Sequence, residues 1–335
     1  MNINDYSGVF VFAQQVDGKL TSVGLELCGK GKQLAGDLGV KLTAVLLGNG
    51  IAGLTGDLLA HGADRVIFVD DEKLGVYMTE PYVYTLSKVI ENYKPEILLI
   101  GATAIGRDMA PRVSARVKTG LTADCTALDI DAETRNLLMT RPAFGGNIMA
   151  TILCPNHRPQ MATVRPGVMQ KLPVGEAVGE VEEFKLDIPA SCVNVEILDV
   201  IPNPPTRMNI QDATVLVSGG RGIGGPDGFE ELETLAKKLG GTISSSRACV
   251  DAGWIASDRQ VGQTGSTVRP DLYFACGISG QIQHVAGMEE SGYIVAINRD
   301  ETAPIFGVAD LGIVGDLHMV LPALEAEIEK ARAAK

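Results

Sequence analysis

The stretch TVLVSGGRGIGG at residues 214–225 decides the fold of this chain. It is followed by a helical pattern at Phe229–Leu239. The apolar run at 214–217 predicts a buried strand, and the glycines predict a tight loop between that strand and the helix. In open α/β sheets, ligands bind beyond the carboxyl ends of the strands, where this loop lies. The stretch therefore predicts a ligand-binding strand–loop–helix unit.

The loop itself matches the dinucleotide pattern G-x-G-x-x-G through Gly220, Gly222 and Gly225. Pro226 follows at once and delays the helix, and no Asp or Glu occurs about 20 residues on, where an NAD ribose would need one. Arg221 favours a pyrophosphate, because a cation among backbone amides suits that anion. On this motif alone, a ligand-free flexible turn remains the alternative.

A second glycine loop, GISGQIQH at 277–284, follows a predicted strand at Leu272–Ala275. We expect a helix over Gly280–Ala286, capped by Ser279, whose N-terminus would bind an anion. His284 would then lie one turn inside that helix, close to the anion, and we predict a functional role for it.

Neutral polar side chains gather in a third region, SSSR at 244–247 and QVGQTG at 260–265. Serine, glutamine and threonine supply donors and acceptors with little charge, which suits the edge of a flavin ring. A hydrophilic loop, with Arg247 as a surface ion-pair partner, is the alternative.

The same alternation of strand and helix extends outward in both directions, which predicts an α/β fold with mostly parallel sheets flanked by helices. Further strands are expected at Tyr293–Ile297 and Gly312–Val314, with a charged terminal helix over Pro322–Ala333. The first half shows strand signals at Gly8–Ala13, Leu42–Leu47, Arg65–Val69 and Ile97–Ile100, and helical signals near Thr21–Leu38, Ile51–His61, Pro81–Asn92 and Arg107–Val117.

Between the two halves the pattern changes, and four strand signals occur without helices between them. We expect antiparallel hairpins added to the first domain. The proline-containing stretch Ala190–Arg207 predicts a linker, so we divide the chain into an N-terminal α/β domain, 1–203, and a C-terminal Rossmann-like domain, 204–335. The four predicted hairpin strands are Thr126–Asp131, Asn136–Met139, Asn147–Cys154 and Gln160–Val164.

Composition excludes several classes of protein. The net charge of -12 would not neutralise a phosphate backbone, so no nucleic-acid partner is expected. The apolar runs are shorter than the ~20 residues of a membrane span. Six scattered cysteines without a C-x-x-C pair predict no metal site and a reducing cytoplasm. No nucleophile–base motif occurs, so we predict no catalytic residues.

Several ordered motifs resemble the α subunit of electron-transfer flavoproteins, and the resemblance covers essentially the whole chain. In the first half the similar stretches are GRD at 106–108 and ADCT at 123–126. In the second half they are SRACVDAG at 246–253, QVGQTG at 260–265, VRPDLY at 268–273, GISGQIQH at 277–284, IVAIN at 294–298 and APIF at 303–306.

The resemblance implies a bound FAD and a role for each matching residue. The loop that contains Gly220, Arg221 and Gly222 would hold the FAD phosphates together with Ser279, Gly280 and Gln281. Asn298 and Asp316 would contact the adenosine end. Arg247, Gln263, Thr264 and His284 would line the isoalloxazine, and Ser246, Gln260 and Gly277 belong to the same cofactor-binding set.

The resemblance also implies a heterodimer with a β subunit, with the first domain contacting that subunit and the FAD domain swinging about the linker. Electrons would then pass from a dehydrogenase, typically an acyl-CoA dehydrogenase, to other redox partners. Whether the β subunit holds AMP, or a second FAD for electron bifurcation with NADH, stays open. A stand-alone NAD-dependent oxidoreductase and a non-redox nucleotide-binding module are the competing hypotheses.

Overall fold

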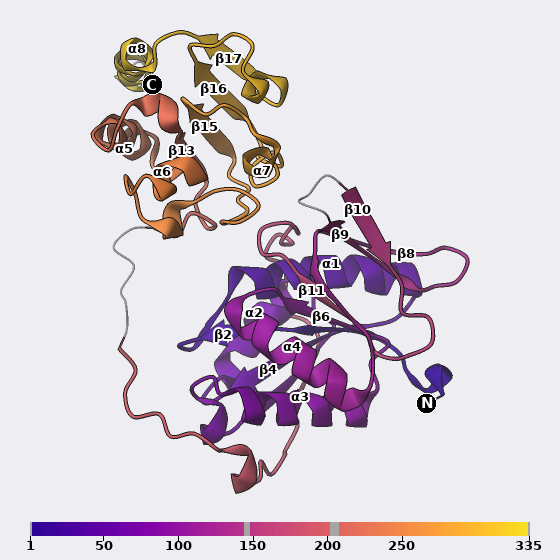
Figure 1. The fold of residues 1–335 in the computed structure, drawn as a ribbon. Helices are drawn as coiled ribbons and strands as arrows, with labels where there is room; N and C mark the ends of the chain where they lie inside the picture. Colours follow the sequence, from indigo (N-terminus) through magenta and orange to yellow (C-terminus); the bar gives the residue numbers. More distant parts are fainter. Residues whose placement is uncertain (1, 144–147, 202–207, 334–335) are drawn as a thin grey trace. The chain divides into compact units, whose positions relative to one another are not determined.

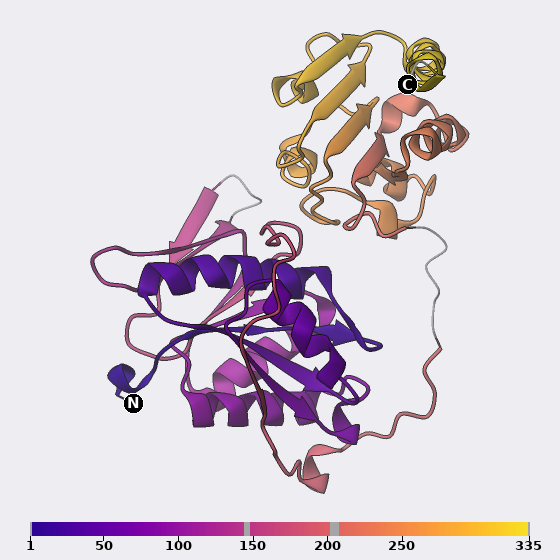
Figure 2. The same cartoon turned by 180° about the vertical axis from the view of Figure 1, so that it is seen from behind.

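The computed structural model describes residues 2–143, 148–201 and 208–333. The chain divides into two compact units, Met1–Ile201 and Pro202–Lys335, whose elements are drawn from two sides in Figures 1 and 2. The predicted boundary between residues 203 and 204 falls outside the described residues. The α/β class predicted from the alternating pattern is confirmed in both units.

The first unit contains a seven-stranded sheet in the order β12-β5-β4-β1-β6-β11-β7, with every neighbouring pair parallel. Its central strands are buried along their whole length because helices cover both faces. The strands are β1 (Val9–Phe12), β4 (Leu42–Gly48), β5 (Arg65–Asp70), β6 (Ile97–Gly101), β7 (Leu121–Cys125), β11 (Gln160–Val164) and β12 (Glu180–Glu183), and a small hairpin pairs β2 (Gln15–Val16) with β3 (Lys19–Leu20).

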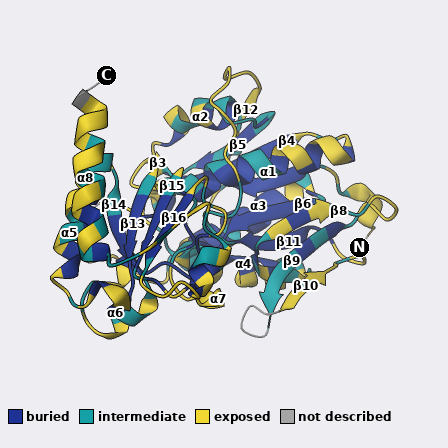
Figure 3. Ribbon diagram, turned by 90° about the horizontal axis from the view of Figure 1, so that it is seen from above, coloured by how far each residue is buried: buried dark blue, intermediate teal, exposed yellow. Residues whose placement is uncertain are grey.

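Two helices cover each face of this sheet. Helices α1 (Ser22–Leu38) and α2 (Thr55–Ala60) pack on one face, and α3 (Thr79–Tyr93) and α4 (Ala104–Val117) pack on the other. Figure 3 shows the consequence, with the strands of the main sheet mostly buried and exposed residues on the outward sides of helices and in loops. None of the helices in the part of the chain described here is long and apolar enough to cross a membrane.

The prediction of antiparallel hairpins is right for three strands and wrong for the fourth. Strands β8 (Ala127–Ile130), β9 (Leu137–Ala143) and β10 (Ile148–Ile152) form an antiparallel sheet. The expected fourth strand, β11, instead pairs in parallel with β6 and β7 inside the main sheet. All five of its residues are buried, and a short buried strand has no alternation that would reveal the direction of its partners.

The second unit contains a five-stranded parallel sheet in the order β14-β13-β15-β16-β17. The chain leaves β13 toward β14 on one side and then crosses to β15 on the other, so the strand order reverses between β13 and β15. A ligand site is expected at that reversal. The strands are β13 (Val215–Gly219), β14 (Thr242–Ser245), β15 (Leu272–Cys276), β16 (Ile294–Asn298) and β17 (Leu311–Val314).

The three predicted helices of this unit begin at other residues than predicted, and a fourth helix, α6, was not predicted. Helix α5 spans Gly228–Leu239 and α6 spans Arg247–Asp251. Helix α7 (Ile282–Val285) is shorter than predicted, and its N-cap is Gln281 rather than Ser279. Helix α8 (Leu317–Ala333) begins five residues before Pro322, because Asp316 accepts a hydrogen bond from the His318 N–H and ends the preceding loop.

Gly106 in α4 sets how closely that helix approaches the end of β6. A Cβ atom at Gly106 would lie 1.8 Å from the Gly101 carbonyl oxygen, whereas one at Gly36 in α1 would meet nothing within 4 Å. We expect Gly106→Ala to lower the free energy of unfolding by more than ~2 kcal/mol through overpacking. Gly36→Ala should raise it by about 0.5–1 kcal/mol, because alanine loses less backbone entropy in a helix. Urea unfolding measures both, and equal effects would contradict the packing assigned to Gly106.

Candidate functional site

A cavity of about 650 Å³ lies in the second unit at the carboxyl ends of its strands, within the 300–1,000 Å³ range of small-molecule sites. Its walls come from the loops that follow β13, β14, β15 and β16, beyond the strand ends, where the sequence predicts a ligand. Of the fifteen predicted site residues, twelve line it: Gly220, Arg221, Gly222, Ser246, Arg247, Gln260, Thr264, Gly277, Ser279, Gln281, His284 and Asn298.

Three predicted residues do not line the cavity. Gly280 lies behind its wall with φ +88°, and a Cβ there would meet the Ile305 nitrogen at 2.2 Å. The Gln263 N–H donates to the Gln283 carbonyl at 2.7 Å. Asp316 caps α8 and pairs with Arg299 at 2.6 Å. Their roles toward FAD stay predictions.

The two glycine loops contact each other through their backbones. The Gly222 N–H donates to the Gly277 carbonyl at 3.0 Å, and the Gly220 N–H donates to the Cys276 carbonyl at 2.9 Å. A Cβ at Gly220 would lie 2.3 Å from the Gly277 oxygen, so only glycine fits. The amides of Gly220 and Gly222 therefore join the loops and are not the open anion donors that the first motif suggested.

The open amides lie instead in the second loop. In the described part of the chain, the N–H groups of Ser279, Gly280 and Gln281 donate no hydrogen bond. Successive free N–H groups in a glycine-containing turn form a concave anion site. Helix α7 is only four residues long, so this turn, rather than a helix N-terminus, is the feature that suits an anion.

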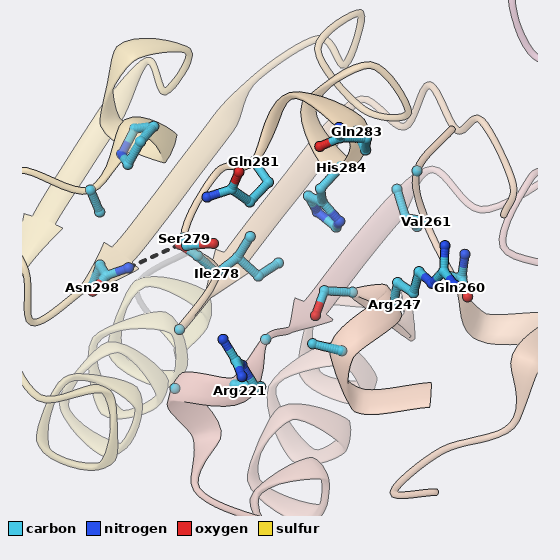
Figure 4. Close-up of a pocket in the computed structure, with 18 of the residues that line it drawn as sticks. Arg221, Arg247, Gln260, Val261, Ile278, Ser279, Gln281, Gln283, His284 and Asn298 are labelled. Carbon is cyan, nitrogen blue, oxygen red and sulfur yellow. Dashed lines mark hydrogen bonds between the residues drawn. The ribbon is translucent and has the colours of Figure 1, made fainter. Parts of the chain in front are cut away.

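The two arginines of the cavity have different surroundings. Arg221 makes no ion pair within the described residues. The Arg247 Nε lies 3.2 Å from an Asp251 carboxylate oxygen, and both side chains are exposed. Figure 4 shows Asn298 toward one end of the cavity and Arg247 with Gln260 toward the other, with Arg221 between them. The unpaired guanidinium of Arg221 is available to an anionic ligand.

His284 is the most buried titratable side chain of the cavity. It is 7% exposed, and burial lowers its pKa to about 4, although the Val261 backbone opposes this shift. The ring is therefore neutral near pH 7. Its Nε2 lies 3.0 Å from the hydroxyl of the fully buried Tyr273, while its Nδ1 is buried without a hydrogen-bond partner among the described residues.

Polar contacts fix two more walls of the cavity. The Gln260 Nε2 donates to the Thr264 hydroxyl at 2.9 Å, and the Asn298 Nδ2 donates to the Ile278 carbonyl at 2.9 Å. Two carboxylates, Asp251 and Asp300, also line the cavity but were not predicted. The sequence contains a feature that could have indicated each of them. Asp251 follows Arg247 by four residues, the spacing of an ion pair on a helix, and Asp300 follows the end of a predicted strand, where ligands bind.

The fold and the cavity together define a doubly wound nucleotide-cofactor-binding protein. The chain matches the family model for the electron transfer flavoprotein domain over residues 9–189, and the model for the electron transfer flavoprotein FAD-binding domain over residues 209–289. The chain belongs to the electron transfer flavoprotein family, as an α subunit, and it binds FAD and transfers electrons.

Relatives of similar length share the whole chain. The electron transfer flavoprotein subunit alpha of Clostridium acetobutylicum is 55% identical over 99% of both chains. A protein of Anaerotignum propionicum named acryloyl-CoA reductase electron transfer subunit beta is 42% identical over 99% of this chain and 98% of its own length. Protein FixB of Azorhizobium caulinodans is 45% identical over 95% of this chain and 88% of its own length.

The residues of the cavity fit FAD. The contact between Gly222 and Gly277 leaves no room for a Cβ atom. The N–H groups of residues 279–281 donate no hydrogen bond among the described residues and can bind a pyrophosphate. Nδ1 of His284 is a buried polar atom without a partner among the described residues. A stand-alone NAD-dependent oxidoreductase is not favoured, because the family models that match are those of electron transfer flavoproteins.

The glycine contact predicts a difference between two substitutions in one loop. A Cβ at Gly222 would lie 2.7 Å from the Gly277 Cα, whereas one at Gly225 would meet nothing within 4 Å. Gly222→Ala should separate the loops and weaken FAD binding at least 10-fold, while Gly225→Ala should bind FAD within about 2-fold of the unaltered chain. Fluorescence titration with FAD measures both constants, and normal affinity in Gly222→Ala would contradict the contact.

The buried neutral His284 predicts a loss of stability in acid. Because its pKa falls from 6.5 to about 4 on folding, the unfolded chain binds this proton first as the pH falls. Its contribution to the free energy of unfolding should therefore decrease between pH 6.5 and about 4, by roughly 3 kcal/mol in total. Urea unfolding of FAD-free protein should show a smaller loss in His284→Gln and an unchanged loss in the control His61→Gln, at a partly exposed histidine in the first unit. An equal loss in all three proteins would contradict the prediction.

Proposed function

We propose that this chain forms a heterodimer with a β subunit and carries electrons from a dehydrogenase of the acyl-CoA dehydrogenase type to other redox proteins. Residues 1–203 would contact the β subunit and residues 204–335 would hold FAD, with the segment between them as a hinge. The name of the Anaerotignum propionicum relative, which refers to an acryloyl-CoA reductase, supports a partner that acts on a CoA thioester. The six cysteines, all free thiols, support a reducing cytoplasm.

One observation carries the assignment of the phosphate site. The free N–H groups of residues 279–281 and the unpaired Arg221 occur where the strand order reverses. We assign the FAD phosphates to Arg221, Ser279, Gly280 and Gln281, with the glycines of the first loop permitting the close approach.

We assign the two ends of FAD as the resemblance to electron-transfer flavoproteins implies. The adenosine end would lie toward Asn298 and Asp316; the Gly315 N–H, one residue before Asp316, donates to the Asn298 carbonyl at 2.9 Å. The isoalloxazine would lie toward Arg247, Gln263, Thr264 and His284, where neutral donors and one cation gather. Ser246, Gln260 and Gly277 would complete the wall on either side.

When bound, FAD supplies the reversible uptake and release of electrons. The residues of this chain tune that chemistry without reacting. The guanidinium of Arg247 favours added negative charge, and the Asp251 carboxylate beside it opposes that effect. His284 remains neutral and contributes hydrogen bonding rather than charge.

Copurification with a coexpressed β subunit tests the proposal. We expect a stable heterodimer that contains FAD and is reduced by an acyl-CoA dehydrogenase with its acyl-CoA substrate. AMP released from the denatured complex would indicate a simple carrier, and a second FAD with NADH-dependent reduction would indicate bifurcation. Failure of the two subunits to associate, or no reduction by any acyl-CoA dehydrogenase tested, would overturn the proposal.

Removal of the cation at the proposed ring end should make FAD harder to reduce. Arg247→Ala should lower the reduction potential of bound FAD by roughly 20 mV, since an exposed charge pair contributes up to about 1 kcal/mol and 30 mV corresponds to about 1.4 kcal/mol for two electrons. Arg269→Ala is the matched control, because Arg269 pairs with Glu290 and does not line the cavity. A redox titration with an unchanged potential in Arg247→Ala would rule out this role.

A further inference from the structure

Tyr273 lies behind the cavity wall and does not line it. It belongs to β15, is fully buried, and directs its hydroxyl at Nε2 of His284 with a separation of 3.0 Å. No prediction from the sequence gave it a role. A phenol buried in an apolar core usually finds a polar partner, and here that partner is a side chain of the FAD site.

The chemistry of the two side chains favours one direction for this hydrogen bond. Burial raises the pKa of Tyr273 above its ordinary value, and the hydroxyls of Ser218 and Ser244 act against that rise. Both serines are fully buried, and neither hydroxyl has a hydrogen-bond partner among the described residues. A phenol O–H is a stronger donor than a neutral imidazole N–H, and an unprotonated imidazole nitrogen is a stronger acceptor than a phenol oxygen, so we expect the Tyr273 hydroxyl to donate to Nε2 of His284.

The surroundings of the other ring nitrogen, Nδ1, are consistent with a Tyr273 hydroxyl that donates to Nε2. A neutral imidazole carries one proton, so an Nε2 that accepts from Tyr273 requires the proton on Nδ1. The Val261 backbone beside the ring raises the pKa of His284 against the larger effect of burial, as a nearby acceptor does. No hydrogen bond of ordinary geometry forms there, and Nδ1 remains a buried donor without a partner among the described residues.

We propose that Tyr273 is a positioning residue of the flavin site, whose hydroxyl donates to Nε2 of His284 and fixes the imidazole in the Nδ1-protonated tautomer. The inference rests on the proposed role of His284 at the isoalloxazine. The proposal specifies that Nδ1 is the atom of His284 that donates any hydrogen bond to an acceptor of the cofactor. An unpaired buried donor is unfavourable, so a ligand acceptor that pairs with it adds affinity.

The tautomer can be measured directly. In protein labelled with ¹⁵N-histidine, long-range ¹H–¹⁵N spectra distinguish a protonated ring nitrogen from an unprotonated one, and His284→Gln identifies the signals of His284. We expect protonated Nδ1 and unprotonated Nε2 at pH 7 in the unaltered protein, with and without FAD. Protonated Nε2 in the unaltered protein overturns the proposal without any Tyr273 variant.

Tyr273→Phe removes only the oxygen atom. We expect a mixture of tautomers for His284 in FAD-free protein, FAD binding weakened about 2- to 10-fold, as for the loss of one hydrogen bond, and a lower reduction potential. Tyr293→Phe, at a half-exposed tyrosine outside the cavity, should change none of these. An unchanged tautomer and potential in folded Tyr273→Phe would overturn the proposal. A failure of the proposed function would be seen separately, because the tautomer is measured without FAD or a β subunit.

Discussion

The second unit depends on one backbone contact, between the loop after β13 and the loop after β15. Gly222 and Gly277 approach so closely that a side chain on either would clash with main-chain atoms. Two hydrogen bonds, from the amides of Gly220 and Gly222, join the loops at the place where the strand order reverses. The same second loop carries the N–H groups of residues 279–281, which donate no hydrogen bond among the described residues, so the contact that closes the fold adjoins the proposed anion site.

The electrostatics of the cavity follow from unequal burial. Arg221 is exposed and unpaired within the described residues, Arg247 is exposed and paired with Asp251, and His284 is buried and neutral. Exposed charges change a reduction potential modestly, because water screens them. A buried neutral ring held by Tyr273 acts through the placement of one proton. The cavity thus combines a screened cation with a fixed hydrogen-bond donor.

The errors of prediction have identifiable physical reasons. The pattern predicts β11 as part of a hairpin because it follows three antiparallel strands along the chain, whereas it inserts between β6 and β7. Strand β14 was not predicted, since its TISS sequence is mostly polar, yet Ser244 and Ser245 are fully buried. Ser279 was predicted as a cap, but the glycine turn extends the loop to Gln281. At β11 and β14 pairing with distant strands outweighed the local pattern, whereas at Ser279 the local glycine turn moved the helix start.

The sequence by itself determined the α/β class through its alternating pattern, and its motifs, through their resemblance to electron-transfer flavoproteins, indicated the family, FAD and twelve of the residues around the cavity. Tertiary structure alone decided the strand order, which amides remain free, and the pairing of Tyr273 with His284. Tyr273 lies in a strand and His284 in the following loop and helix, 11 residues apart. Neither spacing nor residue type reveals such a pair, since burial and hydrogen-bond direction are properties of the packed chain.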